Sequence, residues 1–256
     1  MNSNFTIRVE EPRDFREVET LTRESFWNVY HPGCTEHYVL RCFRSNPDFI
    51  PELSLVMEKD GQIIGHVMFS KAELSIEADG KPTGKKLPIG TFGPISIHPD
   101  FKRQGYGLKL LKYALEKAKA MGIGFICMEG NINFYRHAGF VLASKLNIHY
   151  HCEPKDSEVP YFLAQELIPG YLNGIEATYT PPKGYFVAQE NPEDFTKYEA
   201  EFPYEEKLIS VAKGNGFETL KVCVQNLTEH EMYICKRKGF REETSSDTKN
   251  DLYKHI

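Results

Sequence analysis

The chain has 256 residues, 41% hydrophobic and 26% charged, a balance typical of a globular protein whose core needs no disulfide or metal. Its net charge of -5 argues against nucleic acid as the main partner. We find no secretory signal pattern, no apolar run long enough to cross a membrane and no Cys-x-x-Cys pair among the six cysteines. We therefore expect a cytoplasmic protein with free thiols and with no metal, membrane or nucleic-acid partner.

The N-terminal part predicts a strand followed by two helices. Apolar and polar residues alternate over Phe5–Glu10, which is typical of a strand. Pro12 and Asp14 then open an amphipathic helix, and a second helical stretch runs from about Thr35 to Arg44.

A β-hairpin is predicted next, because Asp60-Gly61 lies between two strand-like runs, Leu53–Glu58 and Gln62–Ser70. We interpret Ala72–Glu77 as a continuation of the second strand. Ala78–Lys86 is polar and contains glycine and proline, which predicts a loop.

The middle of the chain alternates strands and helices. Gly90–His98 predicts a strand, and Gly105–Met121 predicts a helix with one apolar face. A buried strand, a short helix and two further strands are expected at Ile123–Met128, Asn131–His137, Ile148–Cys152 and Tyr161–Leu167. This order of elements predicts a mixed α/β sheet, that is, an α+β arrangement.

The C-terminal part repeats the layout predicted for residues 113–140. A helix, a strand and a second helix are expected at Glu205–Lys213, Thr219–Gln225 and Thr228–Lys238. The pattern indicates either a degenerate half-repeat or a coincidence among common helix stops, and the polar segment Glu242–Asn250 is expected to be mobile. We divide the chain into one domain over residues 1–175 and a C-terminal extension over residues 176–256.

The loop Lys102–Gly107 lies between a predicted strand and the start of the long predicted helix. The first N–H groups of a helix have no partner inside it and attract anions. Gly105 and Gly107 carry no side chain that would keep a phosphate from the backbone, and Lys102 and Arg103 add positive charge. The loop is therefore either a phosphate cradle or a tight strand-to-helix turn.

Two other phosphate-binding loops fit this segment less well. A P-loop ends in Gly-Lys-Ser/Thr, whereas Gly107 is followed by Leu108-Lys109. A dinucleotide-binding loop needs a small residue where Leu110 stands, although Glu129 imitates its ribose-binding acid. That fold also continues as a parallel sheet, and the elements before this loop look like antiparallel hairpins.

The loop and the block Asn131–Phe140 together resemble the GNAT family of acetyl-CoA-dependent N-acetyltransferases. Its signature is a strand, (Gln/Arg)-x-x-Gly-x-(Gly/Ala) and a long helix, then a strand, a short helix carrying a Tyr, and Gly-Phe. Lys102 replaces the usual Gln or Arg, a mild change because the cradle is mainly backbone. The resemblance covers about residues 5–170, and Phe162–Gly174 is similar to the YhbS-type branch.

The resemblance implies a GNAT-like fold with splayed central strands that binds acetyl-CoA as co-substrate and needs no metal. The pantetheine arm would pair with the splayed strand, and the pyrophosphate would lie on the loop. The residues implied to bind the cofactor are Ile95, Ser96, Ile97, Lys102, Arg103, Gln104, Gly105, Tyr106, Gly107 and Asn131. Asn131 is also open to a role as the cap of its short helix.

In this family an amine attacks the thioester directly in a ternary complex, and a tyrosine protonates the departing thiolate. Tyr135 matches that catalytic tyrosine, with a core aromatic as the alternative. Gly90–Ile97 contains no acidic residue, so the general base stays open, and Glu129 is the nearest carboxylate in sequence. Trp27, Tyr30 and Glu129 are the expected acceptor-binding residues.

We therefore predict an N-acetyltransferase that acts on a primary amine of a small molecule or peptide. The alternative is a catalytically silent acyl-CoA-binding or sensor protein. A further hypothesis makes the extension a homodimerisation element that adds strand Thr219–Gln225 to a sheet edge.

Overall fold

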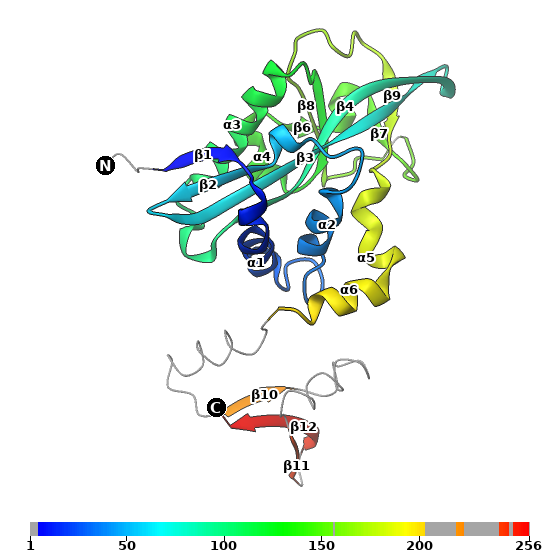
Figure 1. The fold of residues 1–256 in the computed structure, drawn as a ribbon. Helices are drawn as coiled ribbons and strands as arrows, with labels where there is room; N and C mark the ends of the chain where they lie inside the picture. Colours follow the sequence, from blue (N-terminus) through cyan, green and yellow to red (C-terminus); the bar gives the residue numbers. More distant parts are fainter. Residues whose placement is uncertain (1–4, 156, 203–218, 223–240, 246–247, 256) are drawn as a thin grey trace. The chain divides into compact units, whose positions relative to one another are not determined.

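The computed structural model describes residues 5–155, 157–202, 219–222, 241–245 and 248–255. By compactness the chain divides into two units, Met1–Thr196 and Lys197–Ile256. The first unit is built on a mixed sheet with helices on both faces (Figure 1). The boundary expected after residue 175 falls inside this unit, because strand β9 (Glu176–Tyr179) pairs with the main sheet.

The N-terminal elements form where the sequence predicts them. They are β1 (Thr6–Val9), α1 (Phe15–Phe26), α2 (Glu36–Phe43), β2 (Leu55–Lys59) and β3 (Gln62–Ala78). β2 and β3 join at a two-residue turn in which Asp60 and Gly61 both have positive φ. That conformation matches the twist of the two strands, which is why Asp-Gly is a strong hairpin signal.

The prediction of a loop over Ala78–Lys86 is wrong. β3 runs to Ala78 and turns at Asp79-Gly80 into β4 (Lys81–Ile97), so both strands are 17 residues long. Of the residues that suggested a loop, Gly80 forms the turn, whereas Pro82 and Gly84 lie within β4, where Pro82 stands opposite Glu77. Pairing with β3 therefore overrides the weak strand propensity of these residues.

The rest of the first unit confirms the predicted mixed α/β sheet. Its elements are α3 (Tyr106–Ala120), β5 (Phe125–Glu129), α4 (Ile132–Tyr135), β6 (Val141–Leu142), β7 (Ile148–Tyr150), β8 (Phe162–Glu166), β9, α5 (Val187–Glu190) and the start of α6 (Pro192–Glu199). The strand order is β1-β2-β3-β4-β5-β8-β6, and β9 pairs with both β3 and β7. Neighbouring strands are antiparallel except for the pairs β4–β5 and β7–β9, which are parallel.

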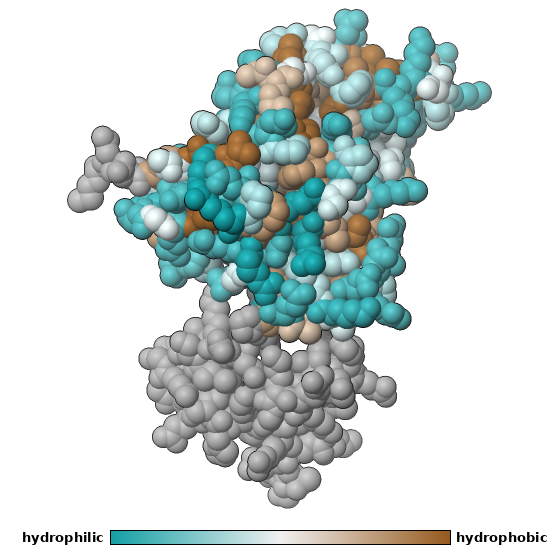
Figure 2. All heavy atoms as spheres, in the orientation of Figure 1, coloured by the Kyte–Doolittle hydropathy of each residue, from teal (hydrophilic) through white to brown (hydrophobic). Residues whose placement is uncertain are grey.

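The helices are divided between the two faces of the sheet, and successive residues of β3 show how. Val67 and Phe69 belong to the core that includes α3, whereas Met68 belongs to the core formed with α1 and α2. A third core, with Phe125 and Phe162, joins β5 and β8 to the outer half of the hairpin and to β7 and β9. Hydrophilic side chains cover most of the visible face of this unit (Figure 2). Apolar side chains gather in the region where Figure 1 labels β4, β6 and β8.

The second unit contains a three-stranded antiparallel sheet in the order β10 (Thr219–Val222), β12 (Thr248–His255), β11 (Arg241–Ser245). β10 lies within the expected strand Thr219–Gln225. The segment Glu242–Asn250, expected to be mobile, contributes residues to β11 and β12, which pair through backbone groups that need no apolar side chain. The expected helices Glu205–Lys213 and Thr228–Lys238, and with them the half-repeat, lie outside the described residues.

Candidate active site

β4 and β5 diverge at the centre of the sheet. The two strands pair only at Gly90 and Ile126. Residues 91–97 of β4 keep β3 on one edge, and no strand in the described part of the chain pairs with their other edge. Two residues of β4, Gly93 and Pro94, stand opposite a single residue of β3, Met68, and so form a β-bulge. A bulge of this kind bends a strand away from its neighbour. The splay expected between the central strands is therefore present.

The loop over residues 102–107 leads from the end of β4 into α3. Gly105 caps the helix with φ of 83°, in the left-handed region that favours glycine. Lys109 N–H donates to Gly105 O, so the N–H groups of residues 106–108 have no acceptor within the helix. A Cβ at Gly105 would meet nothing within 4 Å, so the space beside it is open. The backbone here has the geometry of an anion-binding helix N-terminus.

The polar side chains of this loop differ in what they offer an anion. Lys102 Nζ donates to Ser25 O at 2.9 Å, and Gln104 Nε2 donates to Asp100 O at 2.8 Å. Both side chains thus stabilise the loop and its contact with the end of α1. Arg103 is exposed and makes no hydrogen bond with the described residues, so it is the cation available to a phosphate.

The other two residues of the loop fix the position of α3. Tyr106 is buried, and its ring lies edge-on to Phe5 and Phe101 at 5.9 and 6.0 Å between centroids. A Cβ at Gly107 would lie 3.4 Å from Ile97 and 3.5 Å from Phe134. The first turn of α3 therefore lies against the end of β4 and against α4.

The side chains of the splayed strand are used in packing. Ser96 is buried, and its Oγ donates to Thr22 Oγ1 of α1 at 3.1 Å. Ile95 and Ile97 pack into the core that includes α3. Ile95, Ser96 and Ile97 therefore face the space between β4 and β5 with the edge of their backbone.

Tyr135, the last residue of α4, lies beside the splayed strand on the face that α3 covers. Its ring packs against Phe92 of β4, Phe134 and Phe140, with centroids 5.9, 4.9 and 5.8 Å away. Burial, and to a lesser degree the nearby Tyr30, raises the pKa of its phenol above the ordinary range, so the hydroxyl stays protonated at neutral pH. This hydroxyl makes no hydrogen bond with the described residues and can donate a proton.

Asn131 acts as a helix cap. Its Oδ1 accepts a hydrogen bond from Asn133 N–H at 2.9 Å, at the N-terminus of α4. This contact satisfies one of the N–H groups that a helix start leaves without a partner. The capping alternative for Asn131 therefore has a direct structural basis.

Glu129 lies on the opposite face of β5 from Tyr135. Ile126 and Met128 belong to the core on the α3 side, and Phe125 and Cys127 belong to the core on the other side. Alternation along the strand therefore directs Glu129 away from α3. The phenol of Tyr135 therefore lies on the α3 face of the sheet beside the splay, and the carboxylate of Glu129 lies on the opposite face.

The carboxylate of Glu129 has a partner that the sequence analysis missed. Tyr150 of β7 donates its hydroxyl proton to Glu129 Oε1 at 2.6 Å. The two residues are 21 positions apart, and no local pattern links them. Their contact arises because β7 pairs with β9, and β9 pairs with β3 of the sheet that also contains β5, which only the sheet topology reveals.

The expected acceptor residues before α2 differ in exposure. Trp27 is half-buried, with the Arg23 guanidinium 4.3 Å from its ring centroid, and so serves packing at the end of α1. Tyr30 is 72% exposed, and its partial burial, followed by the negative charges of Glu36 and Glu129, raises the pKa of its phenol. The side chain of Tyr30 is therefore open to a ligand.

Cys34 in the same loop has no nucleophilic character. Its Sγ donates to Glu36 Oε2 at 3.2 Å, and burial raises the pKa of the thiol far above neutrality. The thiolate that would attack a substrate is consequently disfavoured.

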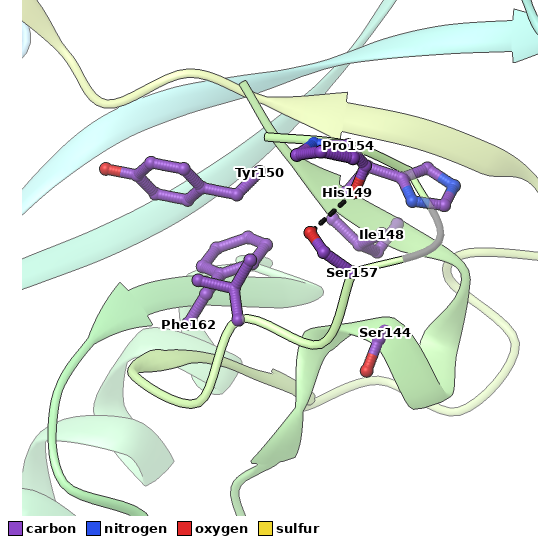
Figure 3. Close-up of a pocket in the computed structure, with 8 residues that line it drawn as sticks. Ser144, Ile148, His149, Tyr150, Pro154, Ser157 and Phe162 are labelled. Carbon is purple, nitrogen blue, oxygen red and sulfur yellow. Dashed lines mark hydrogen bonds between the residues drawn. The ribbon is translucent and has the colours of Figure 1, made fainter. Parts of the chain in front are cut away.

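A small hollow lies beside β7, bounded in part by Pro154, Ser157 and Val159. Ser157 Oγ donates to Pro154 O at 2.6 Å across its rim (Figure 3). No residue of loop 102–107 lines it, so it is separate from the expected phosphate cradle.

Within the described residues, no group of three or more His, Cys, Asp or Glu side chains could hold a metal ion. None of the described helices combines the length and apolar composition needed to cross a bilayer.

The family model of the acetyltransferase (GNAT) family matches residues 15–140. The matched segment contains the splayed strands, the loop before α3 and the helix carrying Tyr135. Residues 15–140 belong to the GNAT acetyltransferase family. The resemblance read from the loop and from the block Asn131–Phe140 is thereby confirmed.

Known proteins are similar to this chain at 22% to 26% identity. The uncharacterized N-acetyltransferase YjhQ of Escherichia coli (strain K12) is 26% identical over 90 residues, which are 35% of this chain and 46% of YjhQ. The chain thus spans about half the length of that relative. YhbS from Escherichia coli, solved in complex with CoA, has a TM-score of 0.59 at 22% identity over 72% of this chain and 93% of YhbS. A GNAT family acetyltransferase from Brucella melitensis, solved in complex with acetyl-CoA, has a TM-score of 0.53 at 22% identity over 72% and 99% of the two chains. Both structures confirm the GNAT-like fold.

Proposed function

We propose that this GNAT protein transfers an acetyl group from acetyl-CoA to a primary amine by direct attack in a ternary complex. The observation that carries the proposal is the splay between β4 and β5, with the open N-terminus of α3 at its end. Family membership supports acyl transfer, and two proteins of the same fold have been solved with CoA or acetyl-CoA.

The backbone would hold most of the cofactor. N–H groups of residues 106–108 and the side chain of Arg103 would bind the pyrophosphate, where the missing side chain of Gly105 leaves open space. The free edge of Ile95–Ile97 would pair with the amide groups of the pantetheine arm, as an added strand pairs with a sheet edge. The acetyl thioester would then lie in the splay.

The chemistry follows from the groups around that position. The amine lone pair forms the new C–N bond at the thioester carbonyl carbon, and the C–S bond then breaks. Backbone N–H groups on the free edge of β4 stabilise the negative charge that develops on the carbonyl oxygen. Tyr135 donates its proton to the departing sulfur, and the nitrogen of the acceptor loses a proton to water.

Thiol release from acetyl-CoA against a panel of primary amines tests the proposal. Loss of general-acid catalysis costs about 100-fold or more in rate, so Tyr135→Phe should lower kcat to that extent with little change in the KM for acetyl-CoA. Tyr113→Phe is the matched control, because Tyr113 is an exposed tyrosine on α3. Binding of acetyl-CoA without thiol release from any amine would favour the silent acyl-CoA-binding protein instead.

A further inference from the structure

Glu129 stands at the end of β5 in an aromatic environment. Tyr150, which donates to Glu129 Oε1, lies edge-on to Tyr161 and Phe162, with ring centroids 5.8 and 5.0 Å away. Glu129 and Tyr161 are themselves exposed. The carboxylate is therefore reachable from solvent and is bordered by aromatic rings.

Backbone pairing holds this arrangement in place. Glu129 is registered against Phe162 of β8, and Gly130 N–H donates to Tyr161 O at 2.8 Å. β7 supplies Tyr150, whose phenol points in the opposite direction from the imidazole of His149 (Figure 3). Because the residues sit on paired strands, the carboxylate has a defined position before any ligand arrives.

The charge of this cluster is negative and uncompensated. Glu129 forms no ion pair with the described residues, and its Oε2 has no hydrogen-bond partner among them. Burial raises the pKa of Tyr150 and Tyr161, and the charges of Glu129 and Glu153 raise it further. Glu153 likewise forms no ion pair within the described part of the chain. A cation would thus meet one free carboxylate oxygen beside the aromatic side chains of Tyr150 and Tyr161.

We propose that Glu129 binds a cationic group of the acceptor, so that the preferred acceptors are amines carrying a second positive charge. This inference rests on the proposed acetyltransferase function. A carboxylate forms strong charge-assisted hydrogen bonds with an ammonium group, and the exposed aromatic ring of Tyr161 would add a cation–π attraction for the same charge. Tyr150 acts as a positioning residue, since it occupies Oε1 and leaves Oε2 for the ligand.

The second charge must be separate from the reacting nitrogen. The nitrogen that attacks has to be unprotonated, and a fixed carboxylate beside it would favour the protonated form. The attack takes place in the splay beside Ile95–Ile97, whereas Glu129 is the last residue of β5. We expect a linear diamine to place one nitrogen in the splay and the other at Glu129.

Kinetics with acetyl-CoA and matched acceptors test the inference. Linear alkane diamines are compared with monoamines of the same chain length for the wild type, Glu129→Gln, Tyr150→Phe and Glu116→Gln. We expect Glu129→Gln to raise the KM of diamines about tenfold or more, as loss of one charge-assisted hydrogen bond does, and to leave monoamines unchanged. Tyr150→Phe should raise the diamine KM less. Glu116→Gln, which removes an exposed carboxylate on α3, should change neither.

Two results would overturn the inference. Equal kcat/KM for diamines and monoamines would show that no second charge is recognised. An equal fall of kcat for both acceptor classes in Glu129→Gln would make Glu129 a general base instead of an anchor.

A binding measurement separates this inference from the proposed function. If no amine releases CoA thiol, the acetyltransferase proposal fails, and calorimetric titration of the diamines into the CoA-loaded protein decides the inference alone. Binding that weakens about tenfold or more in Glu129→Gln supports it. Binding that is equal in wild type and variant, or absent in both, overturns it.

Discussion

Gly130 links β5 to α4, and its lack of a side chain makes room for the Tyr135 ring. A Cβ at this position would lie 2.3 Å from Tyr135 Cε2, 2.8 Å from Cδ2 and 2.9 Å from Met128 Cε. Since carbon atoms pack at about 3.5 Å, Gly130→Ala must displace the ring by about 1 Å. The substitution therefore moves the proposed acid without changing its chemistry.

A displacement of about 1 Å at a reacting group costs about 100-fold in rate. Overpacking costs about 1–3 kcal/mol of stability, which is less than the about 5–15 kcal/mol of a typical domain. We therefore expect Gly130→Ala to stay folded and to lower kcat toward the value of Tyr135→Phe. Thiol release from acetyl-CoA measures the rate, and thermal unfolding measures the stability.

Gly124→Ala is the matched control at the other end of β5. A Cβ there would lie 1.9 Å from Tyr171 Cδ2, so this variant also overpacks its surroundings but does not touch Tyr135. The rate should fall in Gly130→Ala alone when both variants are assayed below their melting temperatures. Equal losses in the two variants, or a wild-type kcat in Gly130→Ala, would refute the reasoning.

Three further predictions concern His66, Arg103 in the loop before α3, and Asn131 at the start of α4. Burial lowers the pKa of His66 from its ordinary 6.5 to about 4, so the unfolded chain takes up the proton first. The free energy of unfolding in urea should therefore fall by about 3 kcal/mol as the pH drops from 6.5 to 4, and by less in His66→Gln. Arg103→Gly should add up to about 1 kcal/mol of stability, because Arg103 has φ of 61°, and should raise the KM for acetyl-CoA several-fold. Asn131→Ala should cost about 1 kcal/mol through the lost cap and leave that KM within about twofold.

Each of these predictions has a result that contradicts it. Stability that is constant between pH 6.5 and 4 would show that His66 titrates normally in the folded protein. An unchanged KM in Arg103→Gly would remove this side chain from the pyrophosphate site. A large rise of that KM in Asn131→Ala would show that Asn131 contacts the cofactor in addition to capping α4.

The sequence by itself determined the parts of this protein whose signals are local. Asp60-Gly61 specifies a hairpin turn because both residues tolerate positive φ, and Gly105 specifies the start of α3 for the same reason. The loop before α3 and the block Asn131–Phe140 are each contiguous, so their resemblance to the GNAT family could be read before the fold was known. The same block predicts Tyr135 as the candidate catalytic tyrosine.

Only the tertiary structure decided which distant residues meet. The continuous pairing of β3 with β4, the joining of β9 to the main sheet and the hydrogen bond from Tyr150 to Glu129 depend on partners far apart in the chain. Strand register sets the face on which each side chain lies, and a shift of one residue would reverse it. Local sequence carries little of that information, so the loop that starts α3 could be predicted from the sequence while the surroundings of Glu129 could not.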